Sequence, residues 1–510
     1  MKNYIKSYLL VLGSKKKQIP LIFIFFLLAS LLDLFGLSLV APLIYSIISP
    51  ESFNDRFDYS FIPNYFFDLS HLQKVIHLGS ILLFVYYAKA YSGFLLYRKI
   101  VIFSLNHQAY LIKTLVRSYQ RMPYSDLLQK NTATFYNMIS NHVRLYTEQT
   151  LMASLKLMSE AIIFLAILSF LGFANIYALI FLVIMFAIIF ISYDFLFKNI
   201  YQTSGKKTAE SIDKVLRNTK EAIGSLKEVR ILNKEEFFNK KVEMASNSYA
   251  HYGSLSQALQ QIPRYLLESV IITFIVILAI YSIYSGQEIA HTIALIGVFG
   301  VGSIRLLPSA YQSMVAISLI RFSSYHLYKL SDDLSDHIKN KLIDNNCISE
   351  YPRLHFEMLQ VQNMNYKYPT STNYILNNIS FNIKKGEFIG IIGESGSGKT
   401  TLVDILLGLL IPKTDDGEIF INNKPLRDQV SEWQNILAYI PQSIFLLDST
   451  IKENITLEDK DSKINFDMLD NAIETSQLNK TINSLSNGLE TNVGDDGIRL
   501  SGGERQRIIL

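Results

Sequence analysis

The sequence predicts two unlike parts: a membrane-spanning all-α region and, behind it, a soluble α/β domain. Hydrophobic residues make up 49% of the 510 positions and charged residues only 18%, whereas a soluble globular chain carries about 25% charge. Six long apolar stretches account for this shortage, and beyond about residue 330 short β-type runs alternate with helical ones, as in α/β domains. The composition excludes a disordered protein, and a net charge of +4 does not indicate nucleic-acid binding.

The first apolar stretch, residues 19–48, contains one charged residue, Asp33. A membrane span needs roughly 20 apolar residues, and the apolar core of a signal peptide is about half as long as this stretch. We therefore interpret it as a transmembrane helix behind a basic N-terminal segment. Five further stretches follow, at 75–97, 151–172, 176–197, 266–285 and 289–308. Six spans place both ends of the region 1–330 on the same side of the membrane.

Basic residues indicate which side that is. The long connecting segments 98–150 and 198–241 carry seven and eleven lysines and arginines, whereas the short turns 172–175 and 285–288 carry none. Positive residues mark the cytoplasmic side, so we expect a multi-pass protein of the cytoplasmic (inner) membrane with its N-terminus and its α/β domain in the cytoplasm. The long segments are rich in helix-forming residues, which predicts membrane helices that extend into the cytoplasm and turn near Pro123 and Gly224.

Residues 331–353 are polar, and we interpret them as a linker to the domain 354–510. Within that domain, 354–361 and 388–392 are predicted strands. Residues 393–400, GESGSGKT, fit the phosphate-binding pattern GxxxxGK[ST] at every fixed position, between the second strand and a predicted helix. Glycines let such a loop fold tightly around an anion, and the helix N-terminus adds donors. The residues expected at the phosphates are Gly393, Ser395, Gly396, Ser397, Gly398, Lys399, Thr400 and Thr401.

A second glycine motif, LSGGERQ, occupies residues 500–506 and opens a helix-compatible run. It presents a second anion site of the same physical type, with Ser501, Gly502, Gly503 and Glu504 as the expected contacts. Because one domain then has two phosphate-facing surfaces, we expect the second to serve a nucleotide that a partner chain holds.

Together, the two motifs resemble those of the nucleotide-binding domain of ABC transporters, and with six spans in front the chain is similar to an exporter-type half-transporter. The resemblance implies ATP and Mg²⁺ as cofactors, ATP hydrolysis coupled to transport, and a P-loop domain in which Tyr368 stacks on adenine. It implies that Thr400 and Gln442 bind Mg²⁺ and that Gln442 also reaches the attacking water. For Tyr368, a tyrosine of the strand core is the alternative.

The resemblance also concerns assembly and length. A homodimer is the simplest arrangement, with Ser501 and Gly503 of one chain over Lys399 of the other; a heterodimer stays open. In that family an apolar strand ending in Asp-Glu and a switch-region histidine follow the second motif, and both would lie beyond Leu510. We therefore expect the α/β domain to be incomplete at its C-terminus and the 510-residue chain to hydrolyse ATP negligibly.

Charges within apolar stretches are costly and mark function by default. Three cations on three spans, Lys89, Arg264 and Arg305, would suit an anionic head group; snorkelling, or pairing with Glu160 or Glu268, is the alternative. The segments around Arg264 and Arg305 resemble those of bacterial lipid-linked oligosaccharide flippases, which implies a polyprenyl-diphosphate-linked glycan as substrate and a short external helix within 51–74. Gln312 stands where those flippases carry a further arginine.

Two other functions stay open. An exporter of hydrophobic drugs or peptides would need an apolar cavity rather than a cationic one. A membrane protein that binds ATP for regulation, without turnover, would need only the nucleotide site.

Overall fold

The computed structural model describes residues 2–39, 42–43, 46–47, 69–285, 289–339, 354–369, 371–458 and 464–510. The chain forms two compact units. The first comprises Met1–Met122 and Gln129–Asn345, and the second Pro123–Leu128 and Asn346–Leu510. Each is considered by itself below.

The first unit is helical. Its main helices are α1 (Lys2–Leu12), α2 (Ile19–Ser38), α5 (His71–Gln120), α9 (Met152–Ala174), α10 (Ile176–Gly224), α12 (Glu235–Leu259), α13 (Ile262–Tyr284), α14 (Ile289–Phe322) and α15 (Ser324–Lys339). Within the described residues, five helical runs are long and apolar enough to cross a membrane: Asn3–Ser38, His71–Gln120, Thr132–Ala174, Ile176–Gly224 and Glu235–Tyr284. The predicted sixth span, 289–308, lies inside α14. Most of the proposed external helix, at 51–68, lies outside the described residues.

The predicted helical extensions are confirmed. Helices α5 and α10 contain 50 and 49 residues, and at about 1.5 Å per residue each far exceeds the roughly 30 Å of a hydrocarbon core. Helix α10 ends at Gly224, as predicted, and α5 ends three residues before Pro123. The short turn between α9 and α10 is closed by Asn175, whose side chain accepts a hydrogen bond from the Ala178 N–H. A break at Gln260 and Gln261, which the sequence analysis missed, separates α12 from α13.

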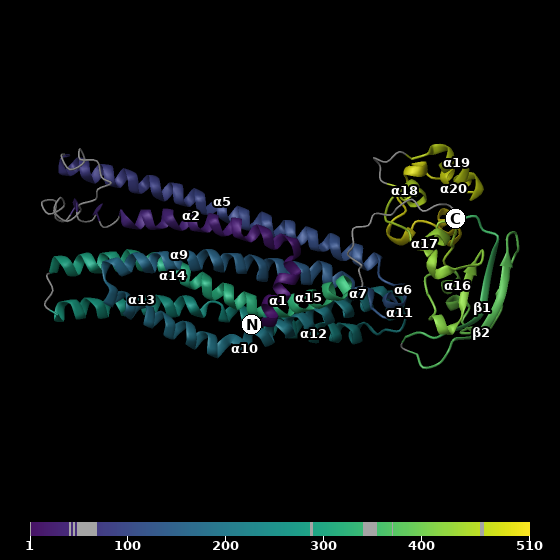
Figure 1. Cartoon of the computed structure of the whole chain (residues 1–510), viewed down its shortest axis with the longest axis horizontal. Helices are drawn as coiled ribbons and strands as arrows, with labels where there is room; N and C mark the ends of the chain where they lie inside the picture. Colours follow the sequence, from purple (N-terminus) through teal and green to yellow (C-terminus); the bar gives the residue numbers. More distant parts are fainter. Residues whose placement is uncertain are drawn as a thin grey trace. The chain divides into compact units, whose positions relative to one another are not determined.

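Two hydrophobic clusters hold this unit together. One joins α9, α10, α13 and α14 through fully buried side chains such as Leu171, Leu182 and Phe274. The other joins α1, α5, α9 and α15, and α1 lies beside α15 (Figure 1). Leu330 and Leu334 belong to this second cluster. The predicted linker 331–353 is therefore wrong over 331–339, which is the last part of a packed helix, because its apolar residues recur at helical spacing within a polar sequence.

The second unit contains an antiparallel sheet with the strand order β2-β1-β3-β4. The strands are β1 (Met358–Tyr366), β2 (Leu376–Lys384), β3 (Glu418–Ile421) and β4 (Lys424–Pro425), and α16 (Lys399–Leu406) packs on them. A separate hydrophobic cluster organises α18 (Ile451–Thr456), α19 (Phe466–Thr475), α20 (Asn479–Ser484) and α21 (Gly502–Ile509).

The predicted strand 388–392 is not formed. Residues 387–394 have no regular secondary structure, and the Phe388 and Ile392 side chains are fully exposed. The physical reason is pairing, since a strand is stable only when its backbone N–H and C=O groups join a ladder. Among the described strands, none pairs with this segment. The first predicted strand, 354–361, exists but begins at Met358.

Candidate functional site

The phosphate loop runs directly into α16, as predicted. Gly396 and Gly398 have φ values of +83° and +90°, a region that side chains with a Cβ rarely adopt. A Cβ on Gly398 would also meet the Ile375 side chain at 2.9 Å. Backbone conformation and space therefore both require glycine at position 398, immediately before the first residue of the helix.

Lys399 folds back over this loop. Its Nζ donates hydrogen bonds to the carbonyl oxygens of Gly393 and Glu394, each at 2.7 Å. These bonds hold one positive charge at the loop, where phosphate oxygens would be bound. Thr400 is exposed at the same helix start and leaves its hydroxyl accessible to Mg²⁺.

The residues present fit Mg²⁺ held together with a nucleotide. Within the described residues, no group of three or more His, Cys, Asp or Glu side chains could hold a metal on its own. Magnesium sites of this class use one or two protein ligands and take the remaining ligands from phosphates and water. The exposed hydroxyl of Thr400 and the exposed amide of Gln442, which lies in an irregular segment, suit that role.

Tyr368 lies beside the helix that follows the loop. Its hydroxyl and the Thr401 hydroxyl are 3.1 Å apart, and its ring meets the Tyr366 ring edge-on at 5.3 Å. The side chain is half-buried against the sheet cluster. Part of the Tyr368 ring is therefore packed in the core. The residue that its hydroxyl contacts, Thr401, is itself buried. Adenine stacking by Tyr368 stays a prediction.

The second glycine motif begins α21 with a capping box. The Glu504 N–H donates to Ser501 Oγ at 3.4 Å, and the Ser501 N–H donates to Glu504 Oε2 at 2.8 Å. The Ser501 hydroxyl also donates to Glu504 Oε2 at 2.7 Å, and this bond, together with the one from the Ser501 N–H, lowers the pKa of Glu504, so the first turn carries a carboxylate. Helices α16 and α21 belong to different hydrophobic clusters, through Ile405 and Ile508. The two predicted phosphate motifs thus have separate structural supports.

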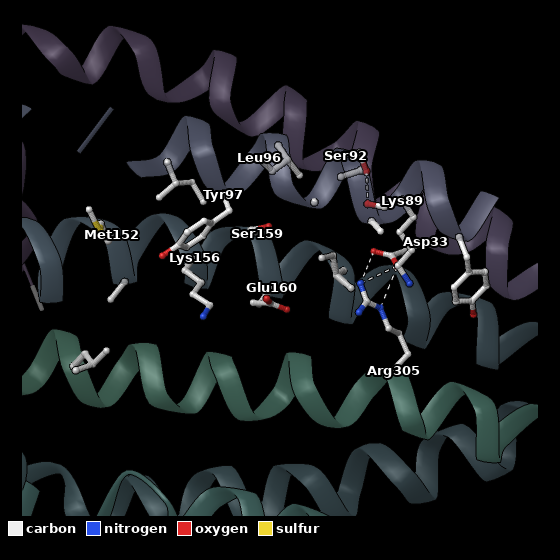
Figure 2. A pocket seen from close by; sticks show the side chains of 18 of the residues that line it. Asp33, Lys89, Ser92, Leu96, Tyr97, Met152, Lys156, Ser159, Glu160 and Arg305 are labelled. Carbon is white, nitrogen blue, oxygen red and sulfur yellow. Dashed lines mark hydrogen bonds and ion pairs between the residues drawn. The ribbon is translucent and has the colours of Figure 1, made fainter. Parts of the chain in front are cut away.

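The first unit contains a cavity of about 620 Å³ between α2, α5, α9 and α14. We call it the charged cavity; the Asp, Glu, Lys and Arg residues that line it are Asp33, Lys89, Glu148, Lys156, Glu160 and Arg305. Asp33 is the most buried of these, at 3% exposure. Figure 2 shows that Lys89 of α5 and Arg305 of α14 both reach Asp33 of α2.

The contacts of Asp33 are short and well directed. Lys89 Nζ lies 2.5 Å from Asp33 Oδ1. Arg305 binds the carboxylate with two hydrogen bonds, from Nε to Oδ1 at 3.1 Å and from Nη2 to Oδ2 at 3.0 Å. Two parallel N–H···O bonds of this kind are the strongest form of an arginine–carboxylate pair. On α9, Lys156 and Glu160 are one turn apart and point toward α14 (Figure 2).

Arg264 does not join this group. It lies in the first turn of α13 and is 57% exposed, and its Nε donates to Glu268 Oε1 at 2.9 Å. The structure therefore brings together Lys89 and Arg305 but not all three predicted cations, and for Arg264 it shows the pairing that the sequence left as an alternative. The residue that joins the other two is Asp33, a charge within the apolar run 19–48 that the sequence marks as unusual but does not link to Lys89 or Arg305.

Residues 19–307, more than half of the chain, match the ABC transporter transmembrane region. The chain belongs to the ABC transporter family. Residues 376–510 match the domain described as ABC transporter, which implies that this domain binds ATP. The transmembrane and ATP-binding regions of this ABC transporter are thus fused in one chain, as in exporter-type half-transporters.

Relatives of this ABC transporter include exporters and lipid flippases. It is 37% identical over 153 residues to the uncharacterized ABC transporter ATP-binding protein YfiB of Bacillus subtilis, covering 30% of this chain and 26% of the relative. It is 33% identical over 153 residues, with the same coverage, to the ATP-dependent lipid A-core flippase of Photobacterium profundum. The matched part of the chain thus spans about a quarter of these relatives.

The fold of this ABC transporter is also that of a solved exporter. The structure of a bacterial Atm1-family ABC exporter with ATP bound superimposes with a TM-score of 0.70 and 17% identity, and covers 94% of this chain and 82% of that chain. At this identity the likeness concerns the fold alone. It supports the predicted fold class, a helical membrane region fused to an α/β nucleotide-binding domain.

Proposed function

We propose that this ABC exporter uses ATP to move a lipid-linked anion, a polyprenyl-diphosphate-linked oligosaccharide, across the cytoplasmic membrane to its outer leaflet. The observation that carries the proposal is the charged cavity, in which Lys89, on a helix long and apolar enough to span a membrane, and Arg305, within the matched transmembrane region, converge on Asp33. Ionised side chains are rare in such helices and mark substrate pathways. A relative named as a lipid A-core flippase supports a lipid as the substrate class.

ATP would act at the second unit. Lys399 would leave the loop carbonyls of Gly393 and Glu394 for phosphate oxygens, and Thr400 with Gln442 would hold Mg²⁺, which neutralises developing charge on the transferred phosphate. Since α16 and α21 have separate supports, we propose that Ser501 and Gly503 complete the nucleotide site of a second copy of the chain. A homodimer is the simplest assembly with this reciprocity.

The test uses the full-length protein in liposomes, with a fluorescent lipid diphosphate and ATP. Arg305→Gln and Lys89→Gln should each slow flipping about tenfold or more, the change expected from losing about 1.4 kcal/mol of charge interaction. Lys240→Gln is the matched control, because Lys240 pairs with Glu236 on an exposed helix face. Flipping that proceeds at the wild-type rate in both cavity variants would contradict the proposal.

A second candidate is an exporter of hydrophobic drugs or peptides. A separate cavity of about 380 Å³ favours it; this apolar cavity lies between α9, α10 and α14 and is lined by apolar side chains including Phe164, Phe186 and Phe190. An uncharged hydrophobic dye separates the two functions. If this candidate is correct, dye transport proceeds in the wild type and is unaffected by Arg305→Gln, and Phe186→Ala reduces it.

A further inference from the structure

Asp33 has no role in the function proposed above, yet it is the centre of the charged cavity. Its carboxylate joins three helices that are distant in sequence: α2, which carries it, α5 through Lys89, and α14 through Arg305. The side chain of Asp33 is 4% exposed, whereas those of Lys89 and Arg305 are 16% and 35% exposed. The cations thus remain accessible from the cavity while the carboxylate lies behind them.

The three cations and three carboxylates that line the cavity are unevenly placed. Two cations face one carboxylate at Asp33, which leaves one positive charge. Lys156 and Glu160 offset each other on α9, and Glu148 is paired with Arg144 at 3.1 Å. A local excess of one positive charge therefore remains next to Asp33. An anion that enters is attracted by Lys89 and Arg305 but repelled by the carboxylate between them.

Asp33 and a phosphate group make the same kind of contact. Both offer oxygen acceptors to the two N–H donors of a guanidinium and to an ammonium. Unpaired cations inside membrane helices are costly, so an empty cavity needs an internal counter-ion and a loaded one does not. The Asp33 carboxylate occupies the acceptor position that a bound phosphate would take.

We propose that Asp33 is an exchangeable counter-ion. It neutralises Lys89 and Arg305 while the cavity is empty, the phosphate of the substrate displaces it, and on release it takes these cations back. This inference rests on the proposed function, because it assumes an anionic substrate in the charged cavity. It assigns to Asp33 a positioning role: the carboxylate weakens substrate binding and thereby speeds release.

Asp33→Asn in the full-length protein tests the exchange. The amide keeps the size of the side chain and removes the competing charge. A fluorescent polyprenyl diphosphate should bind in nanodiscs about tenfold more tightly, the equivalent of about 1.4 kcal/mol, while its flipping in liposomes becomes slower. Tighter binding with slower turnover is a split that a merely structural role would not produce. Unchanged or weaker binding overturns the proposal.

A second comparison covers the case in which two unpaired cations prevent folding. The Lys89→Gln variant keeps one cation and one carboxylate, and the double variant Asp33→Asn/Lys89→Gln keeps the cation alone. The double variant should bind the diphosphate lipid more tightly than Lys89→Gln does, and equal or weaker binding again overturns the exchange. Lys240→Gln serves as the surface control.

Two further probes identify the recognised group. The uncharged polyprenol has the same tail, and inorganic pyrophosphate has the charge without a lipid. If Asp33→Asn binds pyrophosphate more tightly than the wild type does, the exchange is supported and the phosphate is the recognised group. If it binds only the lipid diphosphate more tightly, the exchange is supported and recognition also requires the lipid tail. Tightening of polyprenol binding contradicts it.

The two proposals fail differently. If the wild type binds neither anionic probe, the proposed function and the exchange both fall. If it binds them and removal of the Asp33 charge does not tighten binding, only the exchange falls.

Discussion

Gly205 of α10 lies directly against the backbone of Phe322 at the end of α14: a Cβ on Gly205 would stand 1.9 Å from the Phe322 carbonyl oxygen. Real Cβ atoms do not approach backbone so closely, so any larger residue must push the two helices apart. Tyr201 of α10 is buried one turn earlier, and Ser318 of α14 contacts Tyr193 of α10 at 3.4 Å between hydroxyl oxygens. The glycine therefore permits the close packing of α10 against α14, next to the hydroxyl groups of Tyr193 and Ser318.

We expect Gly205→Ala to destabilise the first unit. Overpacking of this kind costs about 1–3 kcal/mol and should lower the thermal midpoint, measured by the loss of helical circular dichroism, by a few degrees. Gly253→Ala on α12 is the matched control, because nothing lies within 4 Å of its Cβ position. Alanine there should be neutral or stabilise by about 0.5–1 kcal/mol through helix propensity. Equal midpoints for the two variants would show that α10 and α14 can separate without cost.

Tyr368 is suited to a pair of substitutions that separate its ring from its hydroxyl. If the ring stacks on adenine, Tyr368→Phe should keep the ATP dissociation constant near the wild-type value, although it removes the contact with Thr401. Tyr368→Ala should weaken ATP binding about tenfold, as expected from losing about 1.4 kcal/mol of stacking. The measurement is titration with a fluorescent ATP analogue.

The core alternative for Tyr368 gives another pattern. In that case Tyr368→Ala lowers the thermal midpoint of the nucleotide-binding unit and leaves ATP affinity unchanged at temperatures where the protein is folded. Phe381→Ala is the control, because Phe381 packs against the same sheet cluster. This variant shows the effect of losing core packing alone.

Sequence patterns predicted those parts of the fold that are local. The helix ends near Gly224 and Asn175 follow from residues that terminate or cap helices, and the phosphate loop follows from spaced glycines before a helix. The packed helix over 331–339 was missed although Leu327, Leu330, Leu334 and His337 lie at helical spacing and are all buried, because the surrounding residues are polar. The polar composition of this segment indicated a linker, although one face of the helix is apolar.

Features that depend on distant partners were not predictable in this way. The run 388–392 has the composition of a strand, but a strand must also pair with a neighbouring strand. The sequence does not show whether such a pairing strand is available. Asp33 and Arg305 are 272 positions apart, so the unusual charge was visible and its partner was not. The sequence therefore predicted which charged residues within the apolar stretches could form the site. How these residues are arranged could be seen only in the structure.

The buried histidine pair predicts how stability depends on pH. His326 of α15 and His142 face each other with their Nδ1 atoms 2.7 Å apart, so one ring must donate and the other accept. Burial, with the nearby charges of His142 and Arg144, lowers the pKa of His326 to about 3, against about 6.5 in an unfolded chain. Between these values the unfolded state binds more protons than the folded one. The stabilising contribution is therefore complete above about pH 6.5 and is lost as the pH falls toward 3.

We expect the thermal midpoint of the wild type to fall between pH 7 and pH 5, and His326→Asn to reduce this fall, because asparagine has no proton to gain. His251→Gln, at an exposed position on α12, should keep the wild-type slope. The measurement is the midpoint at half-unit pH steps in one detergent and at constant ionic strength. The same slope in His326→Asn and the wild type would mean that another group controls acid stability, since protonation of a ring buried against His142 must cost folding free energy.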